Sequence, residues 1–576
     1  MGKERTGLTP DQLRRVCPVD LFGFDSTESF PGLEEVIGQD RAVEAIDFGV
    51  NIDGDGFNIY VLGPAGAGRT STVKLFVEAR AKEKQVPSDW CYVYNFSEPH
   101  KPVAIRLPPG QAKQFRKDME AFVREMLREI PRALESEAYE NERNRLIQNL
   151  QDSQKAEFLK LEQNANERSF TVRQAPQGLF VVPMVNGKTL EPQQYAQLSE
   201  EQRQGLDKAG EELQGDLQTT LRTIRQMERE VSQKLQDLER QTVVFALGGM
   251  IDEMNEKYRS VPKIGIYLDA VREDVVNNAR DFIPKREQPT QSGVPVQTTQ
   301  TSLNRYSVKV IVDNSVNMGA PVILENNPTF SNLIGRIEHQ PQYGMLVTDF
   351  TMIKPGALHC ANGGYLLLEI EELLRNPFSW QAIKRALKDQ VITITDLGQE
   401  LSMVSTVSLE PEPIPLDVKI VLIGPPMIYY MMLNYDEDFH QLFKVKAEFN
   451  TYMDRTEESV RKYASFLAGR CQQDGLHHFA KDGIARMVEY GSELVGDQTK
   501  LSTRFADICD LMKEADYWSR KNNHTLISKS DVQQAIDAKI RRANRVEEVI
   551  QKMIDEGDIF ISTEGRVVGQ VNGLSV

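Results

Sequence analysis

The spacing of apolar residues divides the chain into three kinds of segment. Short, predominantly apolar runs at residues 57–62, 365–368 and 418–423 are typical of strands that are buried on both faces of a parallel sheet. From residue 111 the spacing becomes that of long helices rich in Glu, Gln, Arg, Lys and Leu, and after residue 455 that of shorter helices. The pattern predicts an α/β core, a parallel sheet with helices on both faces, interrupted by a long α-helical insertion and followed by an all-α lid.

The insertion has the pattern of two long helices joined by a small β element. Residues 111–168 and 198–245 read as helices, and residues 169–190 contain short β runs with a turn at Asn186-Gly187. The second helix carries a heptad seam typical of a coiled coil, formed by Leu213, Leu217, Leu221, Ile224, Met227, Val231, Leu235 and Leu238. We expect an antiparallel hairpin that is either a rigid spacer or an arm that meets substrate or partner subunits.

These changes in pattern set the expected domain boundaries. Residues 1–35 form an N-terminal arm, 36–110 and 263–453 the two parts of the core, 111–262 the insertion, 454–555 the lid and 556–576 a final linker. Residues 284–302 contain three prolines and few apolar residues, which predicts a mobile loop. A capping box at residues 530–533 is expected ahead of the last lid helix.

Composition narrows the class of protein. A net charge of −16 over 576 residues argues against a polyanion-binding surface as the main purpose, so nucleic acid is not expected as a partner. The five cysteines are scattered and lack C-x-x-C spacing, which is typical of reduced intracellular proteins. No run of about 18 apolar residues occurs, so no membrane span is expected and the predicted location is the cytoplasm.

Residues 61–72 fit the phosphate-loop template G-x-x-x-x-G-K-[ST] at every position except the lysine, where Arg69 stands. The apolar run before it predicts a strand, and residues 72–81 predict a helix. Loop amides and the helix N-terminus can cradle an anion, although a planar guanidinium needs more room than an ammonium. The expected nucleotide-binding residues are Gly63, Gly66, Gly68, Arg69, Thr70 and Ser71.

A second nucleotide motif is expected at the end of the apolar run 365–368. Glu369 follows it, where a P-loop ATPase holds Mg²⁺ through an acidic residue, so Thr70 and Glu369 are the candidate metal ligands. Ile370 stands where a glutamate usually polarises the attacking water, and isoleucine cannot act as a base. A register shift that recruits Glu371 instead would bury Glu369 in the strand, which is costly.

Motifs over nearly the whole chain resemble bacterial Lon-related proteases of the LonB/LonC kind. They lie at residues 38–42, 63–70, 327–338, 356–377, 443–449 and 501–507. The resemblance implies a P-loop AAA+ ring module with a helical insertion, a helical lid and a C-terminal Ser-Lys peptidase domain. Residues 569–576 resemble the start of that domain, so the catalytic dyad is expected to lie outside this chain, and Ser575 is not its nucleophile.

The resemblance also implies roles for residues around the nucleotide. Ile37 and Gly38 would wall the adenine pocket, and Arg504 would reach the γ-phosphate unless it is an exposed helix arginine. AAA+ proteins commonly place a polar sensor side chain after the strand at 418–423, and Gly424 and the prolines after it provide none.

Two further assignments concern the substrate and the neighbouring subunit. The resemblance places a substrate-gripping pore loop at Phe330, Leu333 and Ile334, although these could equally be core contacts. No arginine lies in residues 436–449, so Lys444 or Lys446 would have to replace an arginine finger.

The leading hypothesis is the substrate-binding or gating ring module of a Lon-type serine protease that degrades unfolded polypeptides. Its cofactors would be ATP or ADP with Mg²⁺, but Arg69, Ile370 and Gly424 favour a degenerate site that has lost hydrolysis. The family implies a homo-oligomeric ring, expected as a hexamer, and a Lon peptidase domain as partner. One alternative is a working ATP-driven unfoldase. The other is a non-enzymatic polypeptide-binding scaffold.

Overall fold

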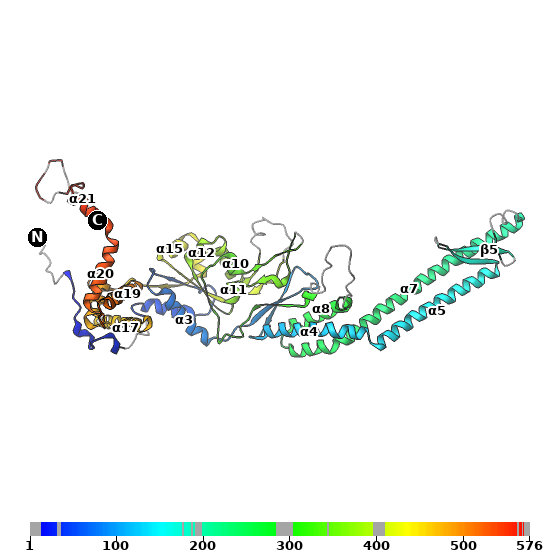
Figure 1. The fold of residues 1–576 in the computed structure, drawn as a ribbon, viewed down its shortest axis with the longest axis horizontal. Coiled ribbons are helices and arrows are strands. Elements are labelled where there is room, and N and C mark those ends of the chain that lie inside the picture. Colours follow the sequence, from blue (N-terminus) through cyan, green and yellow to red (C-terminus); the bar gives the residue numbers. More distant parts are fainter. Residues whose placement is uncertain are drawn as a thin grey trace.

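The computed structural model describes residues 13–30, 36–175, 178–185, 188–190, 198–283, 303–342, 345–395, 409–561, 564–566 and 568–569. The predicted mobile loop at 284–302 and Ser575 lie outside these residues. The molecule is elongated, with the C-terminal helices at one end, an α/β core in the middle and a long helical arm at the other end (Figure 1).

A five-stranded parallel sheet forms the centre of the core, in the order β17-β1-β16-β13-β8. Its strands are β1 (Ile59–Leu62), β8 (Val322–Glu325), β13 (Gly364–Glu369), β16 (Val418–Gly424) and β17 (Val445–Glu448). All four residues of β1 are buried, as are Gly364 to Leu368 of β13, which explains their uninterrupted apolar sequence. This confirms the predicted parallel sheet.

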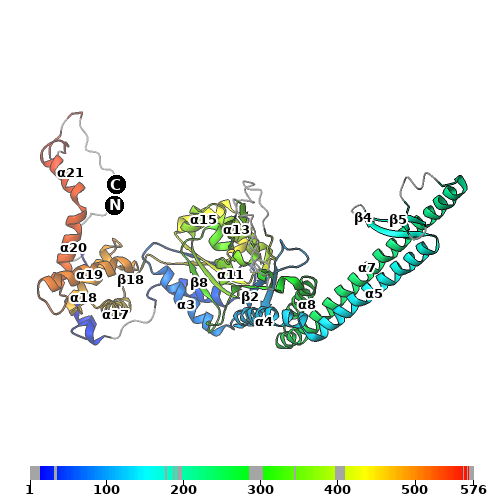
Figure 2. The same ribbon diagram turned by 45° about the vertical axis from the view of Figure 1, so that its right-hand side comes forward.

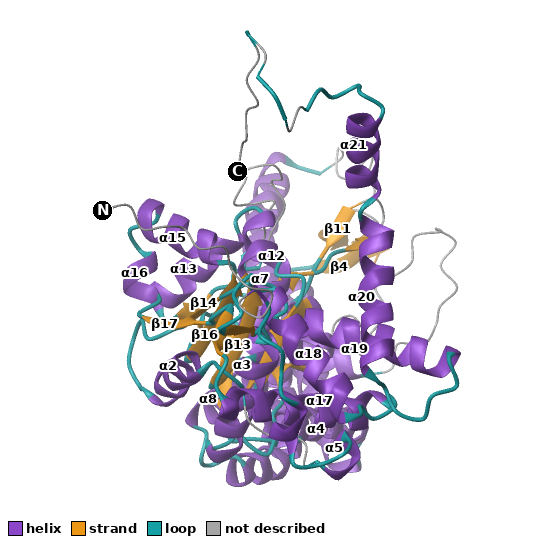
Figure 3. Cartoon of the chain, turned by 90° about the vertical axis from the view of Figure 1, so that its left-hand side faces the viewer, coloured by secondary structure: helices purple, strands orange, loops and turns teal. Residues whose placement is uncertain are grey.

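Helices cover both faces of this sheet (Figure 3). One face packs against α2 (Asp40–Asn51) and α3 (Arg69–Glu83), whose buried residues share a core with Ile59, Val61 and Leu367. The other face packs against α10 (Phe330–Ile334), α11 (Ala357–Cys360), α12 (Ile370–Arg375), α13 (Ser379–Asp389), α15 (Pro426–Tyr435) and α16 (Phe439–Leu442). The core is therefore a three-layer α/β sandwich.

A second, antiparallel sheet of order β3-β2-β7 lies at the base of the insertion. It contains β2 (Asp89–Val93), β3 (Val103–Leu107) and β7 (Val308–Val312), and it shares a core with α4 (Gln111–Leu134), α7 (Glu200–Lys257) and α8 (Pro262–Asn277). Residues 89–110, which the sequence pattern assigned to the α/β core, thus pack with the insertion.

The arm consists of α5 (Glu137–Glu167) and the far part of α7, which lie side by side (Figure 2). The expected single helix over 111–168 is two helices, because α4 ends at Leu134 and Ser136 caps α5 by accepting from Tyr139 N–H. The predicted small β element is present as β4 (Phe170–Ala175), β5 (Gly178–Val185) and β6 (Lys188–Thr189) at the distal end.

The lid is mainly helical, as predicted, and contains α17 (Glu457–Asp474), α18 (Lys481–Glu493), α19 (Phe505–Lys521), α20 (Lys529–Ala543) and α21 (Arg545–Asp555), together with one short strand at Lys500–Ser502. The predicted capping box was misplaced: Ser528 caps α20 and pairs with Asp531, so Ser530 lies inside the helix, and α21 follows. The N-terminal arm packs on this lid, because Cys17 and Phe22 join its core and Cys17 N–H donates to Glu489 at 3.0 Å.

Short elements complete the chain. The remaining strands are β9 (Arg336–Ile337), β10 (Gln340–Gln342), β11 (Met345–Val347), β12 (Ile353–Lys354), β14 (Val391–Ile392), β15 (Ile414–Pro415), β18 (Tyr452–Asp454) and β19 (Lys500–Ser502). Single 3-10 turns lie at Val19–Phe22, Thr27–Ser29, Ala279–Phe282, Asn304–Tyr306 and Phe350–Met352.

Candidate functional site

The phosphate loop connects β1 to α3 at the C-terminal edge of the parallel sheet. Gly66 and Gly68 have φ values of +83° and +79°, a left-handed conformation that glycine adopts without strain. Gly68 caps α3, so the positive end of a 15-residue helix points at the loop. This strand–loop–helix arrangement is suited to binding a phosphate group.

Thr70 and Glu369 meet across the loop, although 299 positions separate them in the sequence. The Thr70 hydroxyl donates to the Glu369 carboxylate at 3.1 Å, and Glu369 is half-buried at the end of β13. A hydroxyl and a carboxylate are hard oxygen ligands of the kind that Mg²⁺ prefers. Thr70 and Glu369, the residues proposed as metal ligands, therefore lie close together and carry the kind of oxygen atoms that bind Mg²⁺.

The two arginines expected at the phosphates are both paired within the protein. Arg69 donates through Nη1 to the carbonyl of Gly63 at 2.7 Å, so its guanidinium folds back over its own loop. Arg504 lies just before α19, half-exposed, and pairs with Asp507 at 3.0 Å. A phosphate has to compete with these partners to recruit either side chain.

The lid contacts the phosphate loop directly. Ala506 N–H donates to the Gly66 carbonyl at 3.1 Å, and a Cβ on Gly66 would lie 2.9 Å from the Ala506 methyl group. Gly38, in the expected adenine pocket, is likewise held against Met453 and Thr503, and Ile37 beside it is buried. The candidate nucleotide site thus lies where the core and the lid meet.

The two other departures from an ATPase site, Ile370 and Gly424, form one packing unit. Ile370 is fully buried, and its side chain points into the core below the strand ends. A Cβ on Gly424 would lie 2.2 Å from Ile370 Cγ2 and 2.8 Å from the hydroxyl of Tyr60. Gly424 is therefore small because Ile370 and Tyr60 occupy the place where a sensor side chain would lie.

The sequence pattern did not single out Tyr60, which lies in the middle of β1. Burial raises the pKa of its hydroxyl; Arg69 opposes this rise, and Glu371 and Glu369 add to it. Glu371 is exposed in the first turn of α12, and Glu369 lies at the end of β13.

The proposed pore-loop residues lie in the core. Phe330, Leu333 and Ile334 are buried against α11 and α13, which agrees with the packing interpretation and leaves none of the three accessible to a polypeptide. Lys444 donates to the Asp55 carbonyl at 2.9 Å, whereas Lys446 pairs with Glu448 at 2.7 Å. Neither lysine contacts the phosphate loop of its own chain.

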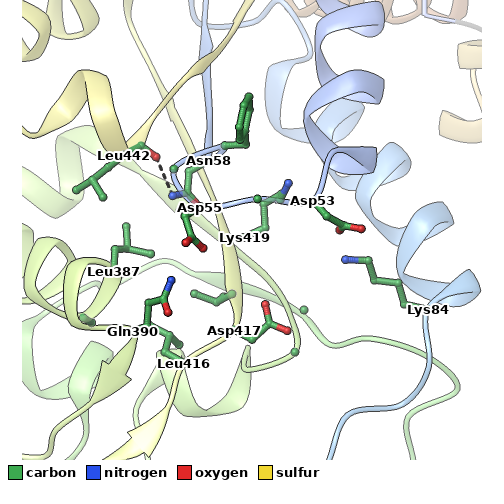
Figure 4. Close-up of a pocket in the computed structure, with 17 residues that line it drawn as sticks. Asp53, Asp55, Asn58, Lys84, Leu387, Gln390, Leu416, Asp417, Lys419 and Leu442 are labelled. Carbon is green, nitrogen blue, oxygen red and sulfur yellow. Dashed lines mark hydrogen bonds between the residues drawn. The ribbon is translucent and has the colours of Figure 1, made fainter.

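A cavity of about 320 Å³ lies at the opposite edge of the sheet, where β1, β13 and β16 begin (Figure 4). Its charged residues are Asp53, Asp55, Lys84, Asp417 and Lys419. Burial lowers the pKa of Lys419, and the nearby Lys84 lowers it further. Because it lies at the other ends of the strands, this cavity is separate from the nucleotide site.

Family models match three parts of the chain. Residues 318–450 match a LonB-like AAA domain, residues 478–542 an archaeal LonB AAA+ ATPase lid domain and residues 89–122 a Lon-like LonC helical domain. All three models describe Lon-related proteins, so these matches relate the chain to the Lon-related family. The AAA match begins at residue 318, so it contains Glu369 but not the phosphate loop. The LonC match begins at β2, in agreement with the packing of β2 and β3 on the insertion.

Similar proteins include two archaeal Lon proteases. That of Thermoplasma volcanium is 28% identical over 284 residues, which cover 46% of this chain and 41% of the relative. That of Thermococcus kodakarensis is 26% identical over 281 residues, with 46% and 42% covered. The chain thus spans only about two fifths of the length of these curated relatives.

Among solved structures, the regulator NtrX from Brucella abortus in complex with ADP is 18% identical and covers 37% of this chain and 42% of its own. The TM-score of this match is 0.25. The AAA-type domain itself indicates a nucleotide-binding fold. Within the described residues, no helix combines the length and apolar character needed to cross a membrane.

Proposed function

We propose that this chain is the AAA-type, substrate-handling module of a Lon-type protease, in which the nucleotide site binds phosphate groups but no longer supports hydrolysis. On this proposal the module assembles into a homo-oligomeric ring and admits unfolded polypeptide to a Lon peptidase domain. The matches to a LonB-like AAA domain and to an archaeal LonB lid domain support the substrate-handling part.

The burial of Ile370 carries the argument against hydrolysis. Its side chain fills the core below Gly424, so position 370 presents no carboxylate and position 424 presents no polar sensor to an attacking water. Loss of these groups removes water activation without removing the phosphate cradle, since the cradle consists of backbone N–H groups and a helix N-terminus.

The groups that would hold the cofactor remain in place. Thr70 and Glu369 would supply oxygen ligands to Mg²⁺, and the amides of residues 66–70 would contact the phosphates. Bound Mg²⁺ would neutralise phosphate charge. Arg69 would exchange its Gly63 carbonyl partner for a phosphate oxygen, and Arg504 would have to leave Asp507.

A working ATPase is the second candidate, and the placement of Glu371 favours it. This carboxylate is exposed at the start of α12, and its charge acts on the same Tyr60 hydroxyl as those of Glu369 and Arg69. Glu371 could then serve as the base in place of the residue at position 370.

Calorimetric titration with Mg²⁺–ATP and Mg²⁺–ADP, combined with a phosphate-release assay, separates the two candidates. The proposed function predicts binding of both nucleotides without turnover. Turnover that is lost in Glu371→Gln and kept in Glu372→Gln, its neighbour in the same turn, supports the second candidate instead. Binding of unfolded casein, measured in parallel, tests the substrate-handling role.

A further inference from the structure

The distal end of the arm holds a small antiparallel sheet of order β4-β5-β6, in which β4 is an edge strand. The sheet lies beside α5 and α7, far from the α/β core (Figure 2). β4 pairs with β5 over six residue pairs with no shift of register. One long side of β4 is therefore open within the described part of the chain.

The backbone pattern shows which groups face that open side. The Ser169 carbonyl accepts from Met184 N–H at 2.7 Å, and in an antiparallel pair the residues that bond to the partner alternate with those that face away. Thr171 and Arg173 hence bond toward β5, while Val172 presents its N–H and C=O outward. No backbone hydrogen bond from the described residues reaches these two groups of Val172.

The two faces of the hairpin differ. Phe170 is buried against Ala165 and Leu213 of the helices, so its face is covered. The opposite face carries Arg173 and Phe180, which are paired across the strands, and the Phe180 side chain is 41% exposed. This face therefore offers apolar surface and one cation beside the open edge.

The sequence of this hairpin carries little of the usual protection of an edge strand. Across β4 and β5 only Arg173 is charged, although the flanking helices are densely charged. Natural edge strands are commonly blocked by charged side chains, proline or a bulge, and β4 has one charge, no proline and no bulge. A weakly protected edge beside a helix that runs about 87 Å at 1.5 Å per residue is well placed to meet another chain.

We propose that the open edge of β4 binds an extended segment of unfolded polypeptide by strand addition. The ligand would pair with the outward backbone groups of β4, and Arg173 would favour a carboxylate on the same face of the ligand. The inference rests on the proposed polypeptide-handling role and names its contact site.

The size of the edge argues against a stable contact with a second copy. Six strand residues make a strip only about 20 Å long and one strand wide, well below the roughly 1,200 Å² of a stable interface. Antiparallel pairing of two β4 strands would also place both Arg173 side chains on one face. A transient, extended ligand fits the edge better.

Two substitutions of Val172 distinguish the contribution of its outward backbone N–H from that of its side chain. Val172→Pro removes the outward N–H without breaking a bond to β5, whereas Val172→Ala shortens the side chain and keeps the N–H. The probe is a fluorescein-labelled octapeptide of alternating Thr and Val with one central Glu, titrated into the full chain by anisotropy. A second peptide, N-methylated at alternate residues, cannot pair through its backbone.

We expect Val172→Pro to bind the octapeptide about tenfold more weakly than Val172→Ala, through the lost hydrogen bond, and the N-methylated peptide to bind neither. As a control, the backbone amides of β5 should exchange hydrogen at equal rates in the two variants, because equal rates show that the hairpin is intact in both. Equal affinities of Val172→Pro and Val172→Ala for the octapeptide would refute the site. The site would also be refuted if the wild type binds no peptide but forms a concentration-dependent dimer that Val172→Pro abolishes. If unfolded casein binds the wild type and Val172→Pro equally, this site is wrong and the proposed function stands, whereas a wild type that binds no casein refutes the proposed function.

Discussion

Replacing Gly424 by alanine should destabilise the α/β core unless Ile370 is shortened at the same time. The new methyl group would lie 2.2 Å from Ile370 Cγ2 and 2.8 Å from the Tyr60 hydroxyl, and overpacking of this kind costs about 1–3 kcal/mol. Ile370→Ala alone leaves a cavity at a fully buried position, at a cost of about 2–5 kcal/mol. In the double variant the added methyl group occupies part of that cavity.

We therefore expect the double variant to be about 1–2 kcal/mol more stable than the sum of the single effects predicts. Trp380 lies in the same buried cluster, so urea unfolding followed by its fluorescence, with Trp90 and Trp518 replaced by Phe, reports on this core alone. Gly49→Ala is the matched control, because its Cβ would crowd Ile59 at 2.8 Å on the opposite face of the sheet and should combine additively with Ile370→Ala. If the changes in unfolding free energy caused by Gly424→Ala and Ile370→Ala are additive, Ile370 and Gly424 do not form one packing unit.

Three further predictions concern the same core. Arg69→Ala should weaken ADP binding about tenfold, through loss of a charge-assisted hydrogen bond, whereas Arg80→Ala in the same helix should not change it; equal affinities in calorimetry would contradict a role for Arg69. Ile370→Glu should lower the stability of the core by several kcal/mol and should not create turnover, because the carboxylate would be buried; a stable variant that releases phosphate would contradict this. Burial lowers the pKa of His359 from 6.5 to about 3. Between pH 6.5 and 3 the imidazole is therefore protonated in the unfolded chain and neutral in the folded one, so the free energy of unfolding falls as the pH falls. The difference in unfolding free energy between wild type and His359→Gln should change by about 1.4 kcal/mol per pH unit between pH 6 and 4. If the unfolding free energies of the two proteins instead change in parallel with pH, the pKa of His359 is not lowered in the folded state.

The fold was predictable where the local pattern is strong. Predominantly apolar runs predicted three strands of the parallel sheet, and the change to charged helices marked the insertion. The boundary at residue 110 was not predictable in the same way, because a short apolar run does not show which sheet it joins. The strand β2 lies in the antiparallel sheet because Cys91 and Val93 pack on the helices of the insertion.

The candidate site was predictable only in its residue types. The loop template identified the glycines and Thr70, and the strand end identified Glu369. The contact of Ile370 with Gly424 and Tyr60 joins three segments that are far apart in the sequence, so no local pattern reveals it. From the sequence, Ile370 and Gly424 look like independent losses, whereas in the structure each explains the other.

The arm tip illustrates the same limit. The sequence predicted a small β element at 169–190, but alternation alone does not show which strand lies at the edge. The hydrogen bond between Met184 and Ser169 fixes the outward groups, and that information comes only from the paired strands.

Whether the nucleotide site has lost hydrolysis is measured by single-turnover and steady-state phosphate release from Mg²⁺–ATP, on the wild type and on Glu369→Gln. We expect ATP to bind to the wild type without hydrolysis above the level of Glu369→Gln, because no carboxylate stands at position 370. Sustained phosphate release by the wild type that Glu369→Gln abolishes would contradict it.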